Sequence, residues 1–193
     1  MIVSRAIREF LDRKLDSFDW IKTATDKELN ESIGSLKPLP RFSTAPWQHQ
    51  KAAFLIGINL PRFLFLYDMG IGKTKAVLDV LAYRAARKEW KRTLVLVPNN
   101  ANIYSWQDDA KVHRPDIPLQ ILVGTSGEKW WAWDRTFVTD ANRPTICVAS
   151  YPGLLAMVCL KINGKMIVDS DKLQIFTSQL QAVVFDESTE LKN

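Results

Sequence analysis

Length, composition and charge place this chain among ordinary globular proteins. Its 193 residues are enough for one domain with a buried core, and 47% hydrophobic and 24% charged residues exclude wholesale disorder. The 26 basic and 21 acidic side chains leave a net charge of +5, which is compatible with a nucleic-acid partner. No apolar stretch has the length of a membrane span and the N-terminus is charged, so we expect a cytoplasmic protein without a membrane partner.

The start of the chain predicts a helical extension that precedes the main domain. Apolar residues at helical spacing predict a helix over residues 4–22, and a second short helix is expected over residues 25–34. The Lys-Pro-Leu-Pro run that begins at Lys37 breaks the helical pattern and marks a linker. We therefore divide the chain into an extension of residues 1–37 and a main domain of residues 38–193.

Strands and helices alternate along the main domain. Helices are expected at residues 47–59, 74–88, 100–112 and 152–158, and apolar strands at residues 63–67, 93–97, 119–123, 144–149 and 182–186. The Asn163-Gly164 pair predicts a hairpin turn. This order predicts an α/β fold with a mostly parallel sheet of about five or more strands and helices on both faces. Ligands of such folds bind at the carboxyl ends of the strands.

The most informative stretch is the turn after the strand expected at residues 63–67. Glycines there allow backbone N–H groups to approach an anion closely, and the following helix adds its dipole. Lys73 would contact the outer phosphates of ATP, and the Thr74 hydroxyl would bind Mg²⁺. Tyr67 stands where the general phosphate-loop pattern has its first glycine, so an ordinary strand-to-helix turn is the alternative. The residues expected to hold the nucleotide are Met69, Gly70, Ile71, Gly72, Lys73 and Thr74.

The last expected strand ends in two adjacent carboxylates, Asp186 and Glu187. In ATP-hydrolysing enzymes the first acid of such a pair holds Mg²⁺, and the second accepts a proton from the water that attacks the γ-phosphate. Because Lys73 and Thr74 lie on the same chain, the pair predicts one site for ATP and Mg²⁺ at neighbouring strand ends.

Both motifs resemble those of superfamily-two helicases, and specifically of the Snf-type double-stranded DNA translocases. Residues 68–74 are similar to motif I of that branch, which does not use the first glycine. Residues 186–193 are similar to its motif II, with Ser188 and Thr189 in place of alanine and histidine. The Asp-Glu-Ser form resembles phage and bacterial members, which implies a bacterial or phage-infected cell.

Three weaker matches follow the order of the family's motifs. Residues 46–50 resemble the Q motif, which implies that Gln50 reads the adenine edge; the alternative is a solvated helix residue. Residues 94–98 resemble motif Ia, and residues 148–151 resemble a later motif that faces nucleic acid. The residues implied in nucleic-acid contact are Pro98, Asn99, Asn100, Ser150 and Tyr151. For the two asparagines, a helix N-cap is the alternative.

The resemblance covers about residues 40–193 and implies the first RecA-like lobe of a two-lobe motor. A second lobe would supply an arginine finger, which contributes on the order of 10³–10⁵ in rate. We therefore expect a fragment that binds ATP and Mg²⁺, hydrolyses ATP poorly by itself, and acts on double-stranded DNA in the whole protein. A stand-alone nucleotide- or DNA-binding module without turnover is one alternative, and a small P-loop kinase is another.

Several residues outside these motifs have simpler interpretations. The tryptophans of the segment 126–142 would either stack on bases or form a buried helix face, and we favour the buried face. Cys147 and Cys159 are expected to be buried free thiols. His49 and His113 have no metal-ligand partners at suitable spacing and are expected to be ordinary surface residues.

Overall fold

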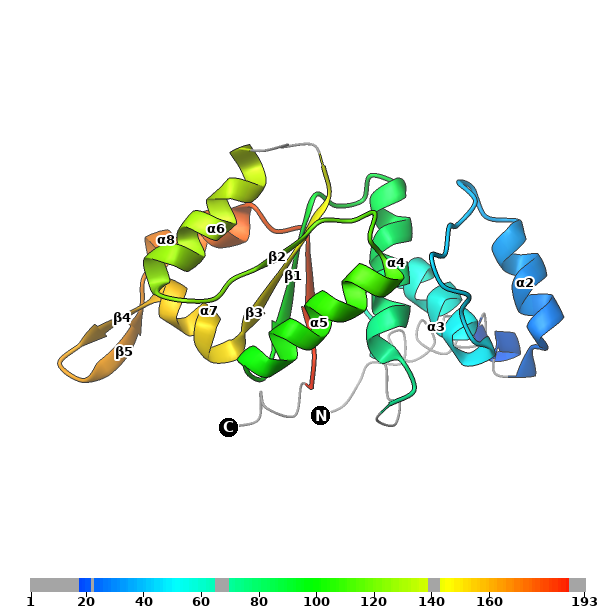
Figure 1. Cartoon of the computed structure of the whole chain (residues 1–193), viewed down its shortest axis with the longest axis horizontal. Helices are drawn as coiled ribbons and strands as arrows, with labels where there is room; N and C mark the ends of the chain where they lie inside the picture. The colour runs from blue at the N-terminus through cyan, green and yellow to red at the C-terminus, as the bar shows by residue number, and fades with distance from the viewer. Residues whose placement is uncertain (1–17, 22, 65–69, 139–142, 188–193) are drawn as a thin grey trace, which may run out of the picture. The chain divides into compact units, whose positions relative to one another are not determined.

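The computed structural model describes residues 18–21, 23–64, 70–138 and 143–187 (Figure 1). The chain divides into two compact units, Met1–Tyr83 and Arg84–Asn193, and each is described by itself. Most of the helix expected at residues 4–22 lies outside the described residues. The last three residues of the strand expected at residues 63–67 do so as well, and Phe63 and Leu64 do not belong to a strand.

The described part of the first unit is helical. Helix α2 spans Asp26–Gly34, α3 spans Gln48–Asn59, and α4 spans Lys73–Ala86, its last three residues belonging to the second unit. The three helices expected here are thus confirmed to within two residues. They share one core of buried apolar residues: Ile21, Ala24, Leu29, Ile33, Phe54, Leu55, Ile58, Val80 and Tyr83. The described residues of the N-terminal extension therefore pack against α3 and α4.

The second unit is built on a parallel sheet of four strands in the order β2-β3-β1-β6 (Figure 1). The strands are β1 (Arg92–Val97), β2 (Leu119–Ile121), β3 (Thr145–Ser150) and β6 (Ala182–Phe185). All neighbouring strands pair in parallel, and Val95 of β1 lies opposite both Val148 and Val184. The parallel α/β fold is thus confirmed. The further strand that we expected falls mostly outside the described residues.

Helices connect and flank the strands. They are α5 (Asn100–His113), α6 (Ser126–Val138), α7 (Tyr151–Val158) and α8 (Ser170–Ser178). A hairpin of β4 (Cys159–Ile162) and β5 (Lys165–Val168) joins α7 to α8. Asn163 and Gly164 at its tip have φ angles of 49° and 78°, so the hairpin turn predicted from this pair is confirmed.

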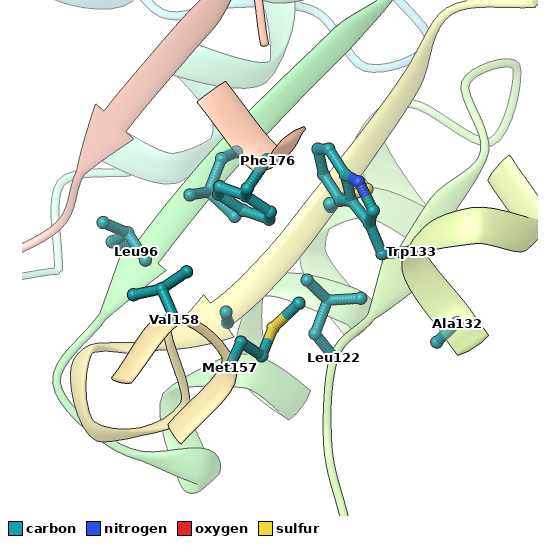
Figure 2. Packing of buried hydrophobic residues seen from close by; sticks show 10 residues of the cluster. Leu96, Leu122, Ala132, Trp133, Met157, Val158 and Phe176 are labelled. Atoms are coloured by element: carbon teal, nitrogen blue, oxygen red, sulfur yellow. The ribbon is translucent and has the colours of Figure 1, made fainter. Parts of the chain in front are cut away.

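One core cluster places α6, α7 and α8 against the sheet. Figure 2 shows Trp133 beside Phe176. The centroids of the two rings are 4.4 Å apart. Trp133 is fully buried, and the indole N–H of Trp130 donates to the Met157 carbonyl oxygen at 3.1 Å. The buried helix face is confirmed for Trp133, whose ring is inaccessible to bases. Trp131, in contrast, is 62% exposed.

The two cysteines differ in burial, which leads to a prediction about their reactivity. Cys147 is buried within β3, which raises the pKa of its thiol from 9.0 to about 12, whereas Cys159 is half-buried. Because the thiolate is the reactive form, Cys147 is expected to resist iodoacetamide in the folded protein and to react after denaturation. Mass spectrometry of the Cys159→Ser variant measures this difference, and equal labelling before and after denaturation would contradict it.

The same raised pKa gives a stability dependence with a defined sign. The folded state keeps the Cys147 thiol neutral up to about pH 12, whereas the unfolded chain ionises it near pH 9.0. Its contribution to folding is therefore fully present below pH 9.0 and is lost as the pH rises toward about 12.

Candidate functional site

Two glycines in the loop directly before α4 have backbone conformations that are common in anion-binding turns. Gly70 and Gly72 have φ angles of 82° and 77°, in the left-handed region that favours glycine. The Gly72 carbonyl oxygen accepts a hydrogen bond from the Ala76 N–H at 3.3 Å, so the helix begins at once after this glycine. The first backbone N–H groups of α4 have no partner within the helix, and the helix dipole attracts an anion to them. Lys73 and Thr74 occupy this first turn.

Two side chains at the start of α3 hold this loop. The Gln50 amide nitrogen donates to the carbonyl oxygens of Ile71 (3.4 Å) and Gly72 (3.3 Å), and its oxygen accepts from the Trp47 N–H at 3.0 Å. The His49 Nε2 atom lies 2.9 Å from the Ile71 carbonyl oxygen. A Cβ atom on Gly72 would overlap the Gln50 amide nitrogen. The loop thus contacts residues 49 and 50, which belong to the segment that resembles the Q motif.

These contacts decide two of the sequence interpretations. Gln50 is only 4% exposed, so the alternative of a solvated helix residue is wrong. Its contact with adenine stays a prediction. His49 is half-buried and bonds to the loop, so the expectation of an ordinary surface residue is also wrong. Its position beside Gln50 at a helix start was the signal in the sequence.

The lysine that follows the loop has a different partner. The Lys75 ammonium lies 2.5 Å from the Asp79 carboxylate within α4, and both side chains are buried. It also lies over the Phe42 ring, 5.6 Å from the ring centroid. Lys75 is therefore a structural residue of the helix, which leaves Lys73 as the lysine suited to phosphate.

In the second unit, the acidic pair and the expected nucleic-acid residues meet at one edge of the sheet. Val97 at the end of β1 lies opposite Ser150 at the end of β3, and Leu96 lies opposite Phe185 at the end of β6. Because these strands are parallel, the residues that follow them share the carboxyl edge of the sheet. Those residues are Pro98, Asn99, Asn100, Tyr151, Asp186 and Glu187.

Asp186 is held there by its backbone and by its side chain. Its N–H donates to the Leu96 carbonyl oxygen at 2.8 Å, and its carbonyl oxygen accepts from the Tyr151 hydroxyl at 2.9 Å. The Trp106 indole N–H donates to its carboxylate Oδ2 at 2.8 Å. Glu187 follows with a φ of 49°, a conformation that is costly for a residue other than glycine and that recurs at functional sites.

Two of the residues expected to contact nucleic acid, Asn99 and Ser150, make capping hydrogen bonds. The Asn99 side chain accepts from the Asn102 N–H at 3.2 Å and caps α5. The Ser150 hydroxyl accepts from the Gly153 N–H at 3.2 Å, caps α7, and donates to the Asn100 side chain at 3.1 Å. The N-cap alternative is therefore confirmed for Asn99. A role of these residues in nucleic-acid binding stays a prediction.

The residues present fit Mg²⁺ bound together with a nucleotide. No group of three or more His, Cys, Asp or Glu residues in the described part of the chain is suited to hold a metal ion. Mg²⁺ does not require such a group, because it is usually bound by one or two carboxylates together with substrate phosphates and water. The Thr74 hydroxyl and the Asp186 carboxylate are both oxygen ligands that suit Mg²⁺. They lie in different units, so their joint action on one nucleotide stays a prediction.

Fold and site together define a class of protein. A parallel α/β sheet, a glycine loop before a helix, and carboxylates at a strand end are typical of RecA-like ATP-binding domains. Over residues 48–193 the sequence matches the family model of the SNF2-related domain, and the chain belongs to this family of ATPase domains.

None of the helices in the described ranges is long and apolar enough to cross a membrane.

Three relatives carry the name Helicase SWR1. The protein from Debaryomyces hansenii is 27% identical over 146 residues, and that from Eremothecium gossypii is 25% identical over 162 residues. The protein from Saccharomyces cerevisiae is 27% identical over 130 residues. The alignments cover 72%, 81% and 65% of this chain, but only 9%, 10% and 7% of the relatives' lengths. The relatives are eukaryotic, so the expected phage or bacterial source has no support.

Proposed function

We propose that this chain is the first RecA-like lobe of a SNF2-type, ATP-dependent DNA translocase. The backbone N–H groups at the start of α4 and the Lys73 side chain bind the phosphates of ATP. The observation that carries this proposal is the pair of left-handed glycines, Gly70 and Gly72, placed directly before the helix. Lys73 brings a positive charge to the same turn, where the helix dipole already favours an anion.

Three further residues complete the proposed chemistry. Thr74 and Asp186 hold Mg²⁺, which neutralises phosphate charge when it is bound. Glu187 accepts a proton from the water that attacks the γ-phosphate, the role of a general base. Its left-handed backbone is consistent with a residue held in place for function.

The carboxyl edge of the sheet is the proposed face for double-stranded DNA. Asn99 and Asn100 are exposed there, and Pro98 and Tyr151 flank them at the ends of β1 and β3. Amide side chains and helix N-termini are common donors to the phosphate backbone of DNA. A second RecA-like lobe is the proposed partner for turnover, because it would supply the arginine that stabilises the transition state.

The test of this proposal is nucleotide binding by the Lys73→Ala variant of the 193-residue chain. Hydrogen bonds to charged groups contribute about 1.5–3 kcal/mol, so we expect the affinity for Mg²⁺·ATP to fall about tenfold or more. Calorimetric titration measures the change. The matched control is Lys27→Ala on α2, whose side chain is 86% exposed. Equal affinities for Lys73→Ala and the unsubstituted chain would remove Lys73 from the site.

A further inference from the structure

The carboxylate of Asp186 has a neutral, fixed hydrogen-bond donor. Trp106, in the second turn of α5, is 3% exposed and donates its indole N–H to Asp186 Oδ2 at 2.8 Å. A buried indole N–H needs an acceptor, and an exposed backbone carbonyl would serve equally well for folding alone. Here the acceptor is instead the side chain of Asp186, the residue that follows β6, at the proposed metal site.

We propose that Trp106 is a positioning residue, which orients the Asp186 carboxylate for a divalent cation bound with nucleotide. This inference rests on the proposed function. The other carboxylate oxygen, Oδ1, accepts no hydrogen bond from the residues that the structure describes. With Oδ2 held by Trp106, the rotation of the carboxylate is restricted and Oδ1 is presented as a ligand.

The chemistry of the indole suits this task. An indole N–H is a donor only, and it carries no charge. A lysine or arginine at this position would also orient the carboxylate, but its positive charge would compete with the cation. Trp106 therefore fixes the carboxylate and leaves its negative charge available. Hydrogen bonds to ligating carboxylates typically change metal affinity by about 10–100-fold when they are removed.

The main chain of Asp186 is held independently of Trp106. Its N–H bonds to Leu96 of β1, and its carbonyl oxygen accepts from the Tyr151 hydroxyl at the start of α7. The backbone position of Asp186 therefore does not depend on the indole. Removing the indole N–H is expected to free the carboxylate while the end of β6 stays in place.

The experiment compares two variants of the same chemical kind in the full chain. Trp106→Phe keeps an aromatic ring in the core and removes the donor to Asp186. The control, Trp130→Phe, removes an indole N–H that donates to the Met157 carbonyl oxygen, away from the site. We expect Trp106→Phe to raise about tenfold the Mg²⁺ concentration that half-saturates ATP binding, and Trp130→Phe to leave it unchanged.

A second measurement requires neither substitution of Trp106 nor turnover. The chain has seven tryptophans, whose indole N–H groups give separate signals in a ¹H–¹⁵N NMR spectrum. We expect the Trp106 signal to shift in the Asp186→Asn variant, and also on titration of the unsubstituted chain with Mg²⁺·ATP. The Trp130 signal should stay in place in both cases. This measurement decides the question should Trp106→Phe fail to fold.

The outcomes separate this inference from the proposed function. If the unsubstituted chain binds ATP without any dependence on Mg²⁺, or does not bind it, the proposed function fails and the inference fails with it. If binding depends on Mg²⁺ but Trp106→Phe behaves like Trp130→Phe, only the inference is overturned. An unmoved Trp106 signal on Mg²⁺·ATP binding overturns it as well.

Discussion

Replacing Trp133 with alanine is expected to lower the free energy of unfolding by about 3–5 kcal/mol, the usual cost of removing a large buried aromatic side chain. Trp133 is fully buried, and its ring packs against Phe176 at 4.4 Å between centroids (Figure 2). Its indole N–H also donates to the Gln179 side chain at 2.7 Å. The substitution therefore leaves a cavity at the junction of α6, α8 and the sheet, and it removes a hydrogen bond between α6 and the C-cap residue of α8.

Trp131 on the same helix provides the matched control. It is 62% exposed, and the Arg135 guanidinium lies over its ring, 4.5 Å from the ring centroid. Trp131→Ala is expected to cost no more than about 1 kcal/mol. Urea denaturation followed by circular dichroism measures both variants. Equal losses for the two would mean that the buried face of α6 has been assigned wrongly.

Elements with strong periodicity or continuous burial could be predicted from the sequence. Strands β1 and β3 consist of six buried residues each, and the apolar runs that they contain, residues 94–97 and 146–149, identified them as strands of a parallel sheet. Helix α8 escaped prediction for a physical reason. Its apolar residues Leu173 and Ile175 are exposed and only Phe176 is buried, so the helix has no apolar stripe to detect.

The candidate site could be predicted only in part, because spacing along the chain identifies a motif but not its distant neighbours. Glycines followed by Lys73 are recognisable since the loop and the helix start are contiguous in sequence. Trp106 and Asp186, in contrast, are 80 residues apart and meet only because α5 packs beside the strand ends. In the sequence, Trp106 is indistinguishable from any other core position of an amphipathic helix.

Gln50 makes a contact in the structure that was not predicted from the sequence. Its resemblance to the Q motif implied only a role toward adenine. The structure shows its amide bonded to the carbonyl oxygens of Ile71 and Gly72. Both N–H donors of the Gln50 amide are thus directed at the loop, whereas its oxygen accepts one hydrogen bond from the Trp47 N–H and keeps a second lone pair, which is the part of the amide left for a base.

Replacing Gly72 with alanine is expected to weaken Mg²⁺·ATP binding roughly a hundredfold. Left-handed backbone costs an alanine about 1–2 kcal/mol, and the added methyl group would overlap the Gln50 amide as well. In the Gly72→Ala variant without nucleotide, we expect the loop to relax into a conformation that avoids both penalties. Binding must then restore the strained conformation, so a total of about 2–3 kcal/mol appears as lost affinity rather than as lost stability.

Two other glycines separate the contributions to this loss. Gly70 has a φ of 82°, and no atom of the described residues lies within 4 Å of its Cβ position, so Gly70→Ala tests strain alone and should cost about tenfold in affinity. Gly34, at the end of α2, has no positive φ, and within the part of the chain that the structure describes no atom lies within 4 Å of the place that an added methyl group would take. Gly34→Ala should therefore leave the affinity unchanged. Calorimetric titration ranks the three variants, and equal affinities for all of them would contradict the loop geometry.

A double substitution then tests the contact between Gln50 and Gly72 directly. Gln50→Ala alone removes the hydrogen bonds that hold the loop, and it should weaken binding. In the Gly72→Ala background the same change also removes the overlapping amide, so the double variant should bind more tightly than Gly72→Ala. Coupling of this sign arises only between groups in contact, because distant substitutions add independently. Simple additivity of the two losses would show that the α3 segment does not support the loop.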